Sequence, residues 1–186
     1  MKLHSLSLVL VLMVVLLMTG CGALTSVEPL ATDSNSIFDP ALLGVWSDLD
    51  GSSSVIVYVR EGEKHSYDIV WLDTQNGDVT HLRARMAQIG GQQILDMTSQ
   101  ESSNPAFSIP GHAFVRINNL ENGMQFRFLD SDWLREKAQQ SKLPLHSQGV
   151  SGLLFTGTTT QLQDFMMQFG LDDQAQSEPM SLRKLK

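Results

Sequence analysis

The sequence predicts a mainly β protein, folded as a single antiparallel up-and-down β-barrel or a strongly curved meander of about eight strands. Two observations predict this class. Short runs alternate apolar and polar side chains with a period of two, and glycine-containing turns separate the runs. Such alternation is typical of antiparallel strands, and Asn-Gly or Gly-Gly between two runs is typical of hairpins. A meander of this length must close or stack, because its outer strands would otherwise expose unpaired backbone groups.

The first residues have the composition of a secretory signal. Lys2 precedes an almost unbroken apolar run over residues 6–18. As a helix, these residues extend roughly 20 Å, whereas a hydrocarbon core of about 30 Å needs nearer 20 apolar residues. The run therefore predicts a signal peptide over residues 1–20 rather than a comfortable membrane span. An uncleaved signal anchor, or an ordinary signal peptide followed by a coincidental cysteine, remains an alternative.

Residues 18–21, Met-Thr-Gly-Cys, resemble the lipobox of bacterial lipoproteins, which reads Leu, a small residue, Gly or Ala, and Cys. The resemblance implies cleavage before Cys21 and acyl chains, palmitate among them, on that cysteine. Two or more acyl chains hold a protein stably at a membrane. Gly22 stands where an Asp retains such lipoproteins in the inner membrane of enteric-type bacteria. The resemblance therefore places the protein in a bacterial cell envelope, at the periplasmic face of the outer membrane rather than the inner membrane.

The composition limits the partners of the remaining chain. Without residues 1–20 the 186-residue chain keeps 166 residues, enough for one domain with a core. The full chain carries 13 basic and 20 acidic residues, and Lys2 is the one charged residue lost, so the net charge changes from −7 to −8. This balance argues against nucleic acid as a partner. Cys21 is the single cysteine, so disulfides within the chain and cysteine-based metal sites are excluded.

The expected domain is preceded by a tether and followed by a tail. Residues 21–40 are rich in Ser, Thr, Asp and Pro without a period, which predicts the lipidated cysteine and a flexible spacer. Residues 41–170 form the predicted β domain, and residues 171–186 are expected to be a flexible tail. The predicted strands are residues 45–47, 53–60, 66–72, 79–88, 92–98, 112–118, 124–129 and 152–157.

Two helices interrupt the strand pattern. Residues 131–140 combine an acidic start with good helix formers. Thr158 and Gln161 have the spacing of a capping box and predict a helix over residues 159–169. Its apolar residues recur at i, i+3, i+4 and i+7, and Gly170 follows where a helix should end.

Gly44-Val45-Trp46 resembles the Gly-x-Trp element in the first strand of lipocalins. In that family the tryptophan plugs the closed end of a calycin-type barrel, so the resemblance implies this structural role for Trp46. It also implies a C-terminal helix packed on the barrel wall. Bacterial lipocalins are known as outer-membrane lipoproteins, which agrees with Cys21.

By this resemblance the protein binds a small apolar ligand or an envelope partner. The inward side chains of the strands would line a ligand cavity, although a filled core is the alternative, because eight-stranded barrels occur in both forms. The candidate ligand-binding residues are Trp71, Leu82, Met86, Met97, Val115, Phe126 and Phe128.

No catalytic or metal-binding motif stands out, so we expect no cofactor, no metal and no enzymatic activity. The histidines after the signal are dispersed, without the spacing of a zinc site. One alternative is an envelope hydrolase acting on lipid or peptidoglycan, which would need His65, His112 or His146 beside a carboxylate or serine. Another is a structural or inhibitory module that works through an exposed patch, for which Phe107 in the long segment 99–111 is a candidate.

Overall fold

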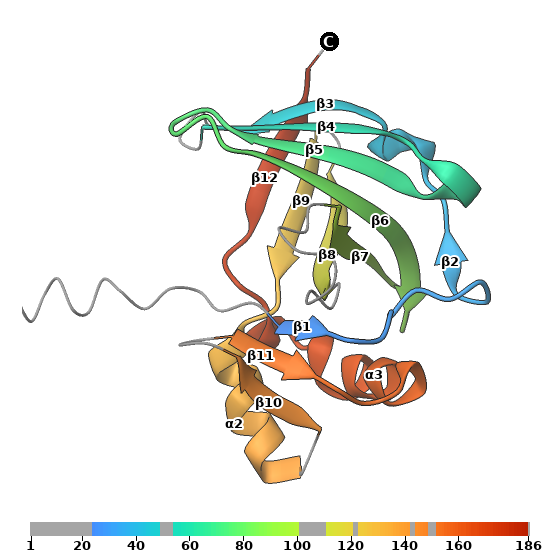
Figure 1. Cartoon of the computed structure of the whole chain (residues 1–186), viewed down its shortest axis with the longest axis vertical. Helices are drawn as coiled ribbons and strands as arrows, with labels where there is room; N and C mark the ends of the chain where they lie inside the picture. Colours follow the sequence, from blue (N-terminus) through green and yellow to red (C-terminus); the bar gives the residue numbers. More distant parts are fainter. Residues whose placement is uncertain are drawn as a thin grey trace, which may run out of the picture.

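The computed structural model describes residues 24–48, 54–100, 111–120, 123–141, 144–148 and 152–185. Cys21 and Phe107 lie outside these ranges. Eight strands form a closed antiparallel barrel, which confirms the predicted fold class. Each strand from β3 to β9 pairs with the next along the chain, and β12 closes the barrel between β9 and β3 (Figure 1). The barrel strands are β3 (Gly44–Asp48), β4 (Val55–Glu61), β5 (Tyr67–Asp73), β6 (Val79–Ile89), β7 (Gln92–Ser99), β8 (His112–Leu120), β9 (Gly123–Phe128) and β12 (Met180–Lys184).

The closing strand corrects the prediction of a flexible tail over residues 171–186. β12 pairs with both β3 and β9, and Leu182 on its inner face is 1 % exposed. The predicted last barrel strand is also wrong in its place. It forms β11 (Gly152–Phe155), which lies outside the barrel between β10 (Leu145–Gln148) and β1 (Leu24–Ser26). The β domain therefore extends past residue 170, because tertiary pairing orders a short basic segment.

The prediction of a flexible spacer fails from residue 24 onward. β1 (Leu24–Ser26) pairs in parallel with β11 and antiparallel with β8, and β2 (Ser36–Ile37) pairs with β6. Leu30, which lies in the chain between β1 and β2, is completely buried. The polar composition of this segment predicted a flexible chain, but its Ser, Thr and Asn side chains form hydrogen bonds to nearby backbone and order it. The Ser36 hydroxyl, for example, donates to the Thr32 carbonyl at 2.6 Å.

Both predicted helices are present. α2 spans Ser131–Ser141, and α3 spans Thr159–Phe165 and continues into a wider helical turn over Met166–Gly170. Thr158 and Gln161 form the expected capping box. Three short 3₁₀ turns complete the elements: η1 (Pro40–Leu42), η2 (Glu63–His65) and η4 (Asp173–Ala175). None of the described helices is long and apolar enough to cross a membrane.

Strand alternation divides the apolar side chains between two cores. Inward residues of the barrel strands form the first core, which includes Trp46, Met86 and Phe126. Outward residues such as Phe114 form the second with β1, β11 and the inner face of α3, including Phe165. The second core lies between the barrel and the elements packed on it. Figure 1 shows α2, α3, β10 and β11 gathered together next to the barrel strands.

Candidate functional site

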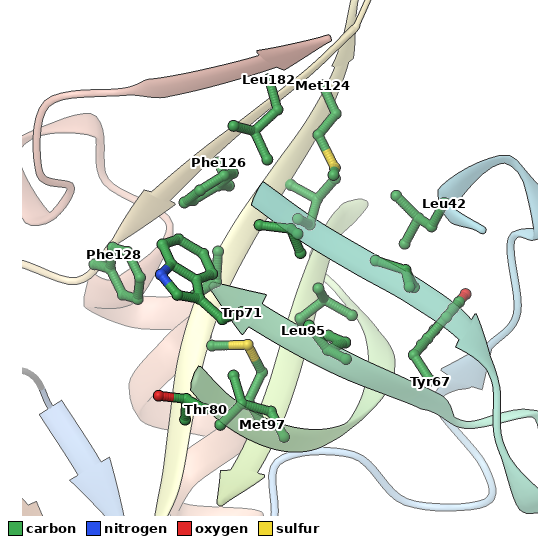
Figure 2. A pocket seen from close by; sticks show the side chains of 16 residues that line it. Leu42, Tyr67, Trp71, Thr80, Leu95, Met97, Met124, Phe126, Phe128 and Leu182 are labelled. Carbon is green, nitrogen blue, oxygen red and sulfur yellow. The ribbon is translucent and has the colours of Figure 1, made fainter. Parts of the chain in front are cut away.

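The barrel encloses a cavity of about 280 Å³, so its interior is hollow. Sixteen residues from the barrel strands and η1 line it, and nearly all are apolar (Figure 2). The alternation of side chains along each strand produces this lining, because every second residue points inward. An apolar cavity of this size favours an apolar ligand over a polar one.

One end of the cavity is closed. Tyr67 is fully buried there, and its hydroxyl accepts a hydrogen bond from the Asp39 amide at 2.7 Å and donates to the Asp39 carbonyl at 3.3 Å. Burial raises the pKa of Tyr67 above its ordinary value of 10.0. Phe38 stacks on the Tyr67 ring with 5.0 Å between the ring centroids. These contacts hold the segment before η1 across the end of the barrel.

Trp46 strengthens the same end. Its indole N–H donates to the Leu42 carbonyl at 2.8 Å, and Leu42 lines the cavity. The Lys184 ammonium lies 5.3 Å from the Trp46 ring centroid, in the geometry of a cation–π contact. Trp46 itself is buried in the barrel core without lining the cavity. These contacts are compatible with the plug role, which stays a prediction.

The opposite end is open. Trp71, Thr80 and Phe128 face the cavity and are only partly buried, whereas residues deeper in the barrel are buried. Phe126 contacts Trp71 edge-on at 5.9 Å and Phe128 edge-on at 6.0 Å between ring centroids, and Figure 2 shows the three rings together. A ligand that enters here would first meet an aromatic rim with one hydroxyl group, that of Thr80.

Six of the seven predicted ligand-binding residues line the cavity: Trp71, Leu82, Met97, Val115, Phe126 and Phe128. Met86 is completely buried in the same core but does not line the cavity. The pairing of β6 with β5 ends at Ala84, so Met86 lies beyond the cavity, opposite Ile37 of β2 and Leu95 of β7.

Sequence reasoning missed several lining residues. Val57, Val59 and Tyr67 occupy inward positions of predicted strands, so the same alternation identifies them. Leu182 carried no usable signal, because its strand was expected to be a flexible tail. Leu42 comes from η1, and only the tertiary structure brings it to the cavity.

The histidines occupy different environments. His65 lies at the surface with its Nδ1 3.1 Å from Glu61 Oε1, and His146 is also exposed. His112 differs, because its Nδ1 lies 2.6 Å from Oδ1 of the buried Asp96. The structure thus brings two of the three predicted histidines beside a carboxylate: His65 with Glu61 at the surface, and His112 with the buried Asp96 on the outer face of the barrel. Among the described residues, no group of three or more His, Cys, Asp or Glu side chains is placed to hold a metal ion.

Comparison of the chain with family models gives no match. Neither the curated proteins nor the solved structures contain a match to it.

Proposed function

We propose that this protein is a lipid-anchored envelope protein that binds a slender apolar ligand, such as a fatty acyl chain, inside its barrel. The hollow apolar interior is the observation that carries the proposal. The cavity is large enough to take part of an alkyl chain, which its apolar lining would surround. The protein acts by binding, without a cofactor.

The start of β1 supports the membrane part of the proposal. Lipidated Cys21 would precede Leu24 by three residues, which reach at most about 10 Å when extended. β1 pairs with Ala113 of β8, and Ala113 is also paired with Met97 in the cavity wall. An anchor on Cys21 would therefore hold the barrel against the bilayer, near the supply of acyl chains.

A series of fatty acids of increasing length tests the ligand. Each methylene group that enters the cavity contributes about 0.8 kcal/mol, which is roughly a fourfold gain in affinity. We expect affinity to rise with each added carbon and then to level off at the chain length that fills the cavity. Displacement of a fluorescent fatty acid from a chain that starts at Gly22 measures this. No binding at any length would disprove the ligand.

A pair of variants checks that the cavity is the site. Leu82→Trp fills the lining near the open end, whereas Leu72→Trp places the same bulk on the outer face of neighbouring β5. We expect Leu82→Trp to lower fatty acid affinity at least about tenfold, with Leu72→Trp unchanged. Equal affinities in the two variants would place the binding site elsewhere.

The anchor is tested separately. Incorporation of labelled palmitate and recovery in the membrane fraction should both be lost in Cys21→Ala and kept in Gly22→Ala. Palmitate incorporation into Cys21→Ala would disprove lipidation at this residue, and would leave the ligand experiment unaffected.

A further inference from the structure

A second pocket, of about 470 Å³, lies outside the barrel. Its walls come from the segment 29–33, the η2 turn and the outward faces of β6, β7 and β8. Unlike the barrel cavity, it is lined by charged and hydroxyl-bearing side chains. An apolar ligand of the barrel could form no hydrogen bonds or ion pairs with these groups, so this pocket would bind a different kind of ligand.

Asp96 and His112 form the best-ordered part of the pocket wall. Oδ2 of Asp96 accepts hydrogen bonds from the Leu30 and Ala31 amides at 2.8 and 2.9 Å, and Oδ1 lies 2.6 Å from His112 Nδ1. The carboxylate acts as acceptor throughout, so the hydrogen of the third bond belongs to Nδ1. A buried carboxylate of this kind fixes the orientation of the imidazole ring. The other ring nitrogen, Nε2, has no hydrogen-bond partner among the described residues, and His112 lines the pocket.

The pocket wall carries charges of both signs: the cations Lys64, Arg83 and Arg85 line it together with the carboxylates Asp33, Glu63 and Asp96, and Arg85 pairs with Asp33 at 2.9 Å. Asp68 is shared by two guanidinium groups, Arg60 at 3.3 Å and Arg83 at 3.4 Å, and Arg83 lines the pocket. Asp68 can neutralise only one of these two cations, so it leaves part of the Arg83 charge available to the pocket. Lys64 also lines the pocket and makes no ion pair within the described ranges.

The η2 turn contributes two further features. Lys64 and His65 both have a positive φ, 54° and 57°, a conformation that is uncommon for residues other than glycine and that is often found at functional sites. Ser66 follows them and lines the pocket. Its hydroxyl oxygen is buried without a hydrogen-bond partner in the described structure. A buried hydroxyl group without a partner is costly unless a ligand completes its hydrogen bond.

We propose that this pocket binds a phosphate group, in a site independent of the barrel ligand. Arg83 and Lys64 neutralise its charge, and the Ser66 hydroxyl and His112 Nε2 form hydrogen bonds to its oxygens. A phosphate group has enough oxygens to reach groups from η2, β6 and β8 together. It also suits Nε2, because a phosphate monoester can donate its remaining proton to this nitrogen and a phosphodiester can accept a proton from the charged ring. The group belongs either to a small soluble phosphate ester or to a phospholipid head group.

The test follows the imidazole nitrogen signals of His112 by NMR, in the full chain held in nonionic detergent micelles. One arm adds glycerol 3-phosphate, and the other dopes the micelles with phosphatidylglycerol. We expect a saturable shift of the Nε2 signal in at least one arm, and the responding arm identifies the source of the phosphate. No saturable shift in either arm, or the same shift with sodium chloride at equal ionic strength, would overturn the proposal.

Variants separate a ligand site from a purely structural ion pair. Arg83→Gln removes a half-exposed cation that makes no bond to Asp96, so the fold should survive and the affinity should fall roughly tenfold. His112→Gln should show a similar loss, and His146→Gln, on the exposed face of β10, should show none. Unchanged affinity in Arg83→Gln, with the fold confirmed by thermal unfolding, would mean that the Asp96–His112 pair serves only to hold the segment 29–33.

Discussion

Leu182→Ala tests whether β12 closes the barrel. Leu182 is 1 % exposed, lies opposite Asp48 of β3 and Met124 of β9, and lines the barrel cavity. Leu185, three residues later, is 42 % exposed and lies beyond the strand. The two leucines therefore form a matched pair, in which only one depends on the closed barrel.

The structure gives the size of the expected effect. Truncation of Leu182 removes about three buried carbon groups, which together contribute about 2.4 kcal/mol at roughly 0.8 kcal/mol each. Enlargement of the cavity adds a further penalty, so the free energy of unfolding should fall by about 3 kcal/mol. For a domain of this size, that corresponds to a Tm lower by about 6–12 °C. Leu185→Ala should change the free energy of unfolding by less than about 0.5 kcal/mol.

Urea and thermal unfolding, followed by circular dichroism, measure both variants. The slope of the urea transition should be unchanged in Leu182→Ala, because the same surface is exposed on unfolding. If both variants lose equally little stability, residues 180–184 do not close the barrel, and the reasoning from the strand pairing fails.

The remaining predictions concern single contacts. The pKa of Tyr67 is raised in the folded protein, so above about pH 10 the folded protein keeps a proton that the unfolded chain loses. The free energy of unfolding should therefore decrease as the pH rises above about 10. Urea unfolding across this range should show the decrease in the wild type and not in Tyr67→Phe. Thr158→Ala removes the cap of α3 and should cost about 1 kcal/mol, whereas Thr160→Ala in the exposed first turn should cost less; equal losses in thermal unfolding would exclude a specific cap. Asp96→Leu leaves the buried Leu30 and Ala31 amides without an acceptor, so the free energy of unfolding should fall by at least about 2 kcal/mol. Proteolysis in the segment 29–33 should become faster. An unchanged digestion pattern would contradict the role of Asp96.

Local alternation identified most of the barrel. The seven predicted strands between residues 45 and 129 all occur, because each pairs with its neighbour along the chain through a short connection or a single long insert. β1 and β12 escaped prediction because they are short and acquire their order from strands far away in sequence. Hydrophobic periodicity cannot report such pairing in segments of three to five residues.

The difference between local and distant pairing also explains why the barrel cavity was predicted and the outer pocket was not. Trp71 and Phe126 were identifiable as cavity residues, because inward position follows from the register of a single strand. Met86 shares that inward register, yet the end of the β5 pairing moves it beyond the cavity. Asp96 and His112 are outward residues on two strands with a long insert between them, and their contact depends on a backbone segment from elsewhere in the chain. No spacing rule brings those three parts together.

The position of β12 also determines when the barrel can close. Trp46 and Lys184 are cross-strand partners about 140 residues apart, and non-local pairs of this kind slow folding. A chain that emerges with its N-terminus first completes β3 to β9 before their common neighbour exists. During that interval β3 and β9 are two unpaired edges, and exposed edges recruit other strands. Correct folding of this protein therefore depends on how long β3 and β9 stay unpaired before residues 180–184 are added. A chaperone that covers exposed strand edges would have its greatest effect in that interval.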